Sequence, residues 1–333
     1  MQPRRTISSA SNSSESRGNA MKKRIEILNE NQGVFFAGQL KYLETAIYRV
    51  EYAELLGKQL FDVDESIPLG FVSGAYRSLD IRGKANWING AAKDLPRADI
   101  ATAETVFPIK TIGASFGYDV LEIEAARAVG MNLETERANA AAYIVETGID
   151  EAIFAGVPDL GIFGLFTAPG IPNDQAALNG GGLSRTFADK TADEILADIN
   201  GAFSRTAVDS KGRERPGKLI LPVLQYNDIA TRRLGTTSDT TVLEFIVSKS
   251  PYLRSMDDVR AVPYLTKAGT GGTDMFIIYD PNPVKVQVKL PLDTTIMTDL
   301  ADVQGLEIVT PVIARFGGLV VRYPLSMRKV YGI

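Results

Sequence analysis

The chain has 333 residues, 45% of them hydrophobic and 23% charged, which are the proportions of an ordinary globular protein. It contains no cysteine, which excludes disulfides, thiolate metal sites and cysteine nucleophiles, and no histidine, which removes the commonest general base and metal ligand. No apolar run is long enough for a membrane span and no secretory signal opens the chain, so we expect no membrane partner.

Charge is unevenly distributed along the sequence. Residues 1–24 carry six basic side chains and one acidic side chain, a net charge of +5, whereas the whole chain is −4, which leaves −9 for the remainder. This segment is serine-rich and has little apolar surface to bury, so we expect residues 1–24 to be disordered. It is either a solvated tail or an arm that meets nucleic acid or an acidic neighbouring subunit.

Apolar residues at helical spacing follow this segment and predict a helix that ends at Gly57. They are Leu40, Leu43, Ile47, Val50 and Ala53. Strand-like sequence then occupies residues 71–82 and 105–118. Pro108 lies within the second stretch and indicates an edge strand or a break, because proline cannot donate a ladder hydrogen bond. We therefore expect extended structure here rather than a compact domain.

The connection between these strands, residues 83–100, is long and lacks periodicity. Connections of more than about 12–15 residues are usually functional or disordered. The segment is either a mobile surface hairpin or a loop that contacts a neighbouring subunit. Its composition, one tryptophan among charged side chains, is typical of an interface with an aromatic anchor and a charged rim. The candidate inter-subunit contacts are Lys84, Trp87, Lys93, Asp94 and Arg97.

Two consecutive helices are predicted next. Asp119 and Glu122 fit a capping box that opens a short helix. Asn132 can then cap a second helix that runs to about Ala155, roughly 36 Å at 1.5 Å per residue. Its apolar stripe is mostly alanine and the helix contains Gly148, which together predict an element packed close against it. The stripe comprises Ala140, Ala141, Ile144, Val145, Ala152 and Ile153.

The next part of the chain alternates helical and strand-like sequence after a loop rich in Gly, Pro and Asn at residues 167–190. Thr191 and Glu194 fit a capping box that opens a helix. The buried side of that helix is predicted to comprise Ile195, Ile199, Phe203 and Thr206. We expect further helices at residues 223–234 and 241–247, and strands at 219–221, 259–265 and 275–279. This alternation predicts an α/β lobe.

The clearest alternation of period two lies at residues 284–290, where apolar and polar side chains take turns. Such a pattern predicts a strand with one buried face. Residues 306–313 and 318–322 continue the strand-like sequence. We expect these late strands to return to the lobe that contains the long helix.

Motifs that would indicate catalysis are incomplete. Residues 212–219 approach a phosphate-binding loop, but a leucine replaces the Ser or Thr that would hold Mg²⁺. Ser326 and Lys329 match the Ser-x-x-Lys spacing in a context that looks extended, where residues three apart point to opposite faces. Asp299 and Asp302 could bind a divalent ion, but nothing nearby completes a site. We therefore predict no enzyme, no cofactor and no metal site.

Several segments stand out by their order and spacing along the chain. Besides the long helix and residues 161–170 after it, they are residues 87–99, Leu221-Pro222-Val-Leu-Gln225-Tyr226, residues 241–246 and Phe316-Gly-Gly-Leu319. Together they resemble the major capsid proteins of tailed bacteriophages, in particular a prophage capsid family. The likeness covers about residues 33–333, and the long helix corresponds to the spine helix of that family.

The resemblance implies an α+β protein with the tailed-phage major capsid fold. It implies an N-terminal arm at residues 1–58 and an extended-loop region at 59–118. A peripheral domain with the spine helix would comprise residues 119–166 and 284–325. An axial domain would comprise residues 167–283 and 326–333.

The function implied is that of a major capsid subunit, which forms hexamers and pentamers and closes an icosahedral shell around double-stranded DNA. Contact with the packaged DNA would be non-specific, and further partners could include portal, scaffold or decoration proteins. The protein would be assembled in the bacterial host cytoplasm and end in the virion capsid. Two alternatives remain: the shell protein of an encapsulin-type nanocompartment, which shares this fold, and a carboxylate-dependent hydrolase or transferase. The basic N-terminal segment favours the phage capsid over the encapsulin.

Overall fold

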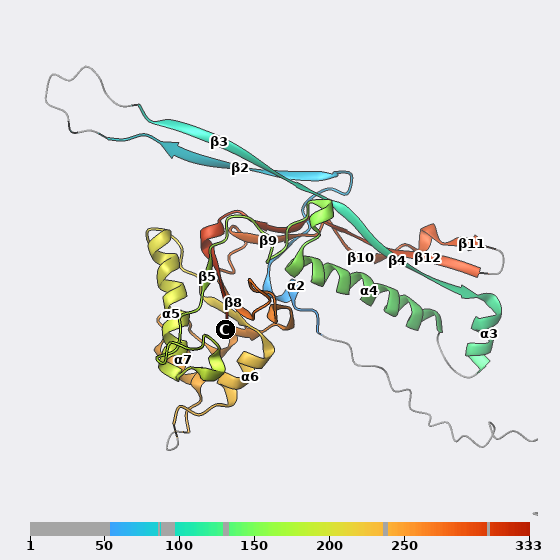
Figure 1. Ribbon diagram of the computed structural model, residues 1–333. Coiled ribbons are helices and arrows are strands. Elements are labelled where there is room, and N and C mark those ends of the chain that lie inside the picture. Colours follow the sequence, from blue (N-terminus) through green and yellow to red (C-terminus); the bar gives the residue numbers. More distant parts are fainter. Residues whose placement is uncertain (1–53, 86, 88–96, 129–132, 236–238, 305–306) are drawn as a thin grey trace, which may run out of the picture. The chain divides into compact units, whose positions relative to one another are not determined.

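The computed structural model describes residues 54–333 except 86, 88–96, 129–132, 236–238 and 305–306, so the tail and the helix predicted ahead of Gly57 lie outside the described residues. The helices are α2 (Gly57–Leu60), α3 (Val120–Ala128), α4 (Leu133–Ala155), α5 (Ala192–Asp209), α6 (Val223–Thr231) and α7 (Val242–Lys249). The strands are β1 (Val63–Asp64), β2 (Ser73–Arg82), β3 (Asp99–Pro108), β4 (Lys110–Asp119), β5 (Asn173–Gln175), β6 (Lys218–Leu221), β7 (Val259–Ala261), β8 (Met275–Tyr279), β9 (Val286–Lys289), β10 (Leu292–Ile296), β11 (Asp302–Gln304), β12 (Glu307–Phe316), β13 (Gly318–Val321) and β14 (Met327–Tyr331). Helices and mostly antiparallel strands confirm the predicted α+β class (Figure 1).

Strands β2 and β3 form a two-stranded antiparallel hairpin that is paired over its full length. Pro108 ends β3 and Lys110 starts β4, which confirms the predicted break. Beyond it, β4 pairs with the whole of β12, in a four-stranded sheet with β10 and β11. The connection predicted over residues 83–100 is slightly too long, because Ile100 already belongs to β3.

Helix α4 packs on the sheet of β4, β10 and β12 and also contacts β13 (Figure 1). A Cβ added at Gly148 would lie 2.7 Å from Cδ1 of Ile112 in β4, so the predicted close neighbour is confirmed. The predicted stripe is partly wrong: Ala140 and Ile144 face outward, and Ile144 is 62% exposed. The buried face of the helix instead follows the i, i+4, i+8 spacing of Ala141, Val145, Ile149, Ala152 and Ile153.

Local capping signals position α3 and α5 as predicted, whereas Asn132, the predicted cap of the long helix, lies outside the described residues. At α3, the Leu121 N–H donates a 2.7 Å hydrogen bond to Oδ1 of Asp119. At α5, the capping box is complete, since the Glu194 N–H donates to Oγ1 of Thr191 and the Thr191 N–H donates to Oε2 of Glu194. The four residues predicted on the buried side of α5 are all buried. These contacts satisfy N–H groups that the first helical turn leaves unpaired.

A five-stranded sheet in the order β5-β14-β8-β6-β7 separates two hydrophobic cores. Its central strand β8 is buried throughout and alternates its side chains between them. Met275, Ile277 and Tyr279 join the core that contains α4. Phe276 and Ile278 join the core that contains α5, α6 and α7. A strand that is covered on both faces reads as a continuous apolar run, which is why the sequence predicts its bounds correctly.

Two strand predictions need correction. The strand expected over residues 259–265 stops at Ala261, because Pro263 starts a 3₁₀ turn. The strand expected from residue 284 begins at Val286, and Val284 is 62% exposed. The residues before β9 form a turn instead, in which the Lys285 N–H donates to a carbonyl three residues earlier, at 2.9 Å.

Candidate assembly surfaces

One face of the β2–β3 hairpin carries large exposed apolar side chains, interrupted by the ion pair of Arg77 with Glu104 at 3.0 Å. Residues directly opposite each other in the ladder share a face, so Leu79 and Ile81 of β2 lie on the same face as Ile100 and Val106 of β3. Their exposed fractions are 70%, 80%, 62% and 60%. Large apolar side chains that gather on one exposed surface mark an interaction site. The hairpin therefore offers a strip for contact with another molecule.

The base of the hairpin is where it joins the body. Phe107 and Ile109 are buried there against Val320, with Tyr76 packed beside them. The Phe107 ring lies so close to Gly74 that a Cβ on this glycine would come within 2.3 Å of it. A two-stranded ribbon is marginally stable by itself, so this small cluster holds the hairpin in place.

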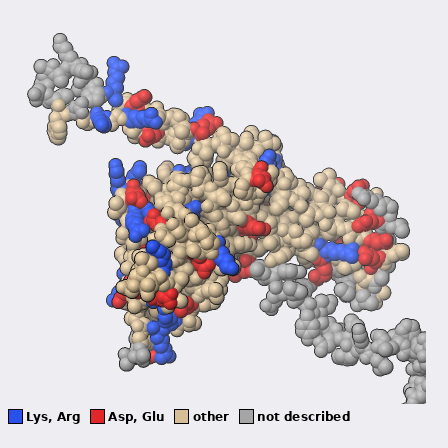
Figure 2. Space-filling view, viewed as in Figure 1, with Lys and Arg blue, Asp and Glu red and all other residues tan. Residues whose placement is uncertain are grey.

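The described members of the predicted contact set lie at the far end of the hairpin. Lys84, Trp87 and Arg97 are exposed, and Trp87 is 105% exposed relative to its reference. Lys93 and Asp94 lie outside the described residues. Figure 2 shows basic side chains gathered beside this end. The exposed apolar side chains of the strands are not among the sequence-based predictions. The alternation of apolar and polar residues in Leu79-Asp80-Ile81-Arg82 indicates that Leu79 and Ile81 share one face.

A second surface feature is the attachment of α2 to the spine helix α4. The predicted role of Gly57 as a helix terminator is wrong, because Gly57 begins α2 and its N–H donates a 2.5 Å hydrogen bond to Oδ1 of Asp150. Asp150 is only 2% exposed, and burial raises the pKa of its carboxyl although hydrogen bonds from Gly57 and Tyr264 act in the opposite direction. The start of α2 is thus fixed to the C-terminal half of α4.

Strand β1 continues this attachment on β9. The Asp64 carboxylate pairs with the ammonium group of Lys289, which is buried. Burial alone would raise the pKa of Asp64, but hydrogen bonds from Lys289 and Ser66 lower it to about 2. Phe61 adds a ring contact with Tyr279 at 5.2 Å between centroids. The segment from Gly57 to Asp64 is therefore held by both polar and apolar contacts.

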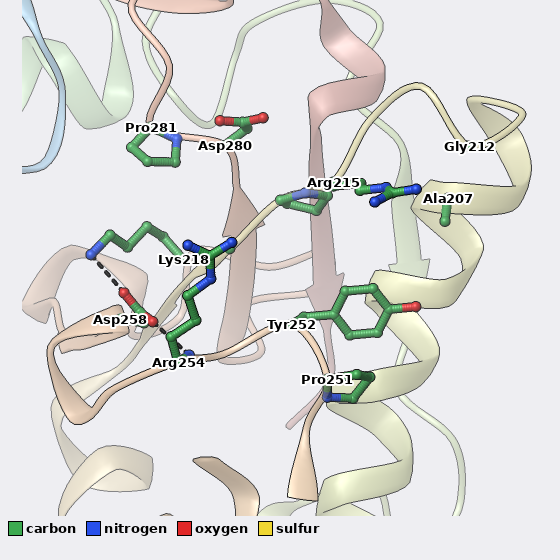
Figure 3. Close-up of a pocket in the computed structure, with 12 residues that line it drawn as sticks. Ala207, Gly212, Arg215, Lys218, Pro251, Tyr252, Arg254, Asp258, Asp280 and Pro281 are labelled. Carbon is green, nitrogen blue, oxygen red and sulfur yellow. Dashed lines mark hydrogen bonds and ion pairs between the residues drawn. The ribbon is translucent and has the colours of Figure 1, made fainter. Parts of the chain in front are cut away.

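A cavity of about 680 Å³ opens beside α5, β6 and the segment after α7 (Figure 3). Its basic side chains are Arg215, Lys218 and Arg254. Residues 212–219, which approach a phosphate-binding loop in sequence, contribute several of its lining residues. A helix precedes this segment and β6 follows it, so it lacks the helix N-terminus that a phosphate-binding loop requires.

The remaining sequence motifs do not come together as sites. Ser326 donates its hydroxyl to the Tyr323 carbonyl, whereas the Lys329 amine donates to the Phe166 carbonyl. In the described residues, Asp299 and Asp302 are not part of any group of acidic side chains that could hold a metal ion. None of the helices described here combines the length and apolar character that a membrane span needs.

Comparison with known proteins identifies the family. A family model described as "Major capsid protein" matches residues 83–333. No curated protein matches the chain. Among solved structures, the capsid of Myoviridae phage XM1 has a TM-score of 0.75 and 18% identity, covering 91% of this chain and 100% of that one.

Two further structures share the fold at lower similarity. The capsid of a native GTA particle has a TM-score of 0.60 and 13% identity over 88% of this chain and 96% of that one. A virus-like particle from Pyrococcus furiosus has a TM-score of 0.52 and 14% identity over 82% and 90%. The family match spans most of the chain, and the fold agrees with phage capsid structures. The chain therefore belongs to the major capsid protein family and is a structural capsid subunit, not an enzyme.

Proposed function

We propose that this subunit assembles with copies of itself into hexamers and pentamers that close an icosahedral shell around double-stranded DNA, in which the β2–β3 hairpin lies across an adjacent copy. The observation that carries the proposal is the exposed apolar face of the hairpin, formed by Leu79, Ile81, Ile100 and Val106. A protein–protein interface of standard size buries about 1,600 Å² in total. A long ribbon laid on a neighbour supplies a large share of that area.

The tip of the hairpin is proposed to complete this contact. Trp87 would serve as the apolar anchor, with Lys84, Lys93, Asp94 and Arg97 at its rim. Tryptophan and arginine are enriched among the residues that dominate binding energy in interfaces. The support is the full exposure of Trp87 next to exposed basic side chains.

We infer a division of the subunit into the regions that the family resemblance implies. Residues 1–58 would form the arm and 59–118 the extended-loop region. Residues 119–166 with 284–325 would form the peripheral domain, and 167–283 with 326–333 the axial domain. Two cores on opposite faces of one sheet support a division into two lobes, and the sheet between them, which the axial domain would contain, contributes side chains to both cores.

Contacts with the packaged DNA would be non-specific and electrostatic. Beyond residue 24 the chain has a net charge of −9, so this part of the subunit would repel the DNA phosphates and not bind the packaged DNA tightly. The basic segment of residues 1–24 could bind DNA or an acidic neighbouring subunit. Assembly would take place in the host cytoplasm, with portal, scaffold or decoration proteins as further partners.

The test is the state of association of the purified full-length chain. Sedimentation velocity and negative-stain microscopy, with and without a co-expressed scaffold, should show rings or closed shells. A single sedimenting species at the monomer mass of 36.1 kDa across concentration and salt would refute the proposal.

A further inference from the structure

The cavity beside α5 and β6 has an excess of positive charge that its own carboxylates do not neutralise. Asp258 binds the Lys218 ammonium at 2.8 Å and accepts backbone hydrogen bonds from Arg254 and Ser255. Asp280 binds Lys285 at 2.6 Å. Both wall carboxylates are therefore satisfied within the subunit.

Glu214 lies between two arginines in the sequence, but its carboxylate joins Asp280 and Lys285 in a cluster of net charge −1, which leaves an excess of one positive charge when Arg215 and Arg254 are included. Its side chain turns inward to Lys285 at 2.6 Å, and the residue is only 8% exposed. Burial alone would lower the pKa of the Lys285 amine, but hydrogen bonds to Asp280 and Glu214 raise it, so these charges are retained inside. Within the described part of the chain, no carboxylate forms an ion pair with the exposed guanidinium groups of Arg215 and Arg254.

The walls of the cavity are rigid and partly apolar. Pro216, Pro251 and Pro281 line it together with Tyr252 (Figure 3). The Tyr252 ring is stacked on buried Phe203 at 4.8 Å between centroids and 11° between planes, which fixes its position. Proline rings and a packed aromatic ring lose little conformational entropy on binding. A preformed concavity of a few hundred Å³ suits a short segment that inserts into it.

We propose that this cavity is a docking site for an acidic peptide segment of a second protein, whose carboxylates bind Arg215 and Arg254 while an adjacent apolar side chain packs against Tyr252 and the prolines. Guanidinium groups bind carboxylates through charge-assisted hydrogen bonds, often as bidentate pairs. The occupant is thus defined by clustered Asp or Glu next to an apolar residue.

Two other occupants fit these observations less well. A second copy of this chain would offer its hairpin tip, but Lys84 and Arg97 there repel a basic cavity. A DNA duplex is a wide rod that contacts protruding cations, whereas these cations line a concavity in a body whose net charge is −9 beyond residue 24. A short acidic segment can enter the cavity and bring its carboxylates to the cations that line it.

The test uses the full-length chain and a library of short random peptides. Panning on the immobilised protein should enrich peptides in which acidic residues flank an apolar one. Binding of an enriched, fluorescently labelled peptide should weaken about tenfold or more in R215E/R254E, because each lost pair is charge-assisted. The matched control, K249E/K267E, reverses two exposed lysines outside the cavity and should bind as the wild type does. A peptide with lysines in place of its acids should bind R215E/R254E instead.

Every other outcome overturns the proposal. Enrichment of neutral or basic peptides would do so, as would acidic peptides that bind R215E/R254E unchanged. If a short DNA duplex displaces the peptide from the wild type and does not bind R215E/R254E, the cavity would be assigned to nucleic acid. Loss of shells in R215E/R254E with normal thermal stability would make it a contact between copies. If R215E/R254E fails to fold, R215Q/R254Q replaces it. Peptide binding is measured on the unassembled subunit, so it tests the docking proposal even if the protein forms no shells.

Discussion

The backbone N–H of Gly57 donates a 2.5 Å hydrogen bond to the buried carboxylate of Asp150, 93 residues later in the chain. This bond fixes the start of α2 to the C-terminal half of the spine helix α4. A Cβ on Gly57 would lie 2.7 Å from Cδ1 of Ile153, so only glycine allows this approach without a shift. The attachment combines a close backbone approach with a buried acceptor, and each can be tested.

Asp150→Ala should lower the free energy of unfolding by about 1–3 kcal/mol, because it leaves buried donors without their acceptor. Glu151→Ala is the matched control, since Glu151 is the next residue of α4 and is exposed; it should change stability by no more than about 0.5 kcal/mol. Urea denaturation of the unassembled subunit measures both. Equal losses in the two variants would mean that Gly57 is not held by this carboxylate.

The Asp64–Lys289 pair predicts a loss of stability in acid. The pKa of Asp64 is lowered from 3.8 to about 2 in the folded protein, so the unfolded state binds the proton more readily. The contribution is complete above the unfolded pKa and disappears as the pH falls from 3.8 to about 2. Asp64→Asn combined with Lys289→Met should flatten the pH dependence of the melting temperature across this window. An unchanged slope would show that the pair is not formed in solution.

Gly148 and Gly164 should respond differently to substitution by alanine. At Gly148 the added Cβ meets only the flexible Cδ1 of Ile112, and alanine favours the helix by about 1 kcal/mol, so Gly148→Ala should be close to neutral. At Gly164 the Cβ would lie 2.3 Å from the backbone nitrogen of Gly156 and clash with two carbonyls, so Gly164→Ala should cost more than about 3 kcal/mol or prevent folding. Thermal melts of both variants test the contrast, and equal effects would contradict the packing described.

Trp87→Ala should leave the fold intact and weaken assembly. The side chain is fully exposed in the subunit, so its removal should move the melting temperature by less than a few degrees. If Trp87 anchors the contact with a neighbour, each contact should lose on the order of 1–3 kcal/mol, which raises the concentration required for shells. Light scattering during assembly measures this threshold. A threshold that does not move would remove Trp87 from the contact.

The sequence predicts best where the signal is local. The capping box of Thr191 and Glu194 depends on residues three apart, and the structure contains it as expected. Pro108 predicts the break between β3 and β4 because a missing N–H acts at one position. In contrast, Lys289 and Asp64 are 225 residues apart, and no periodicity within either strand indicates that they meet.

Faces are harder to predict than elements. Ile144 belongs to an apolar helix and is expected to pack, yet it lies one position from the buried row that includes Val145, and faces out. The apolar strip of the hairpin also requires the β2–β3 register, because Leu79 and Ile100 share a face only once that pairing is known. The resemblance to capsid proteins points to the loop at residues 83–100, whereas Leu79, Ile81 and Val106 lie in the strands that carry it and are also exposed.

The most direct test of the account is shell formation by a variant that removes the two members of the apolar strip that lie in β2, Leu79 and Ile81, without changing the pairing of the strands. Leu79→Thr with Ile81→Thr places threonine, a β-branched residue that suits a strand, at both positions. It removes two apolar side chains whose burial in the contact would contribute about 1.5–3 kcal/mol each if they were fully buried. Ser78→Thr with Ala101→Thr makes the matched change on the opposite face. Negative-stain microscopy at equal concentration should show shells for the control and only subunits or small oligomers for the first variant, with equal melting temperatures. Normal closed shells from Leu79→Thr with Ile81→Thr would contradict a contact through this face of the hairpin.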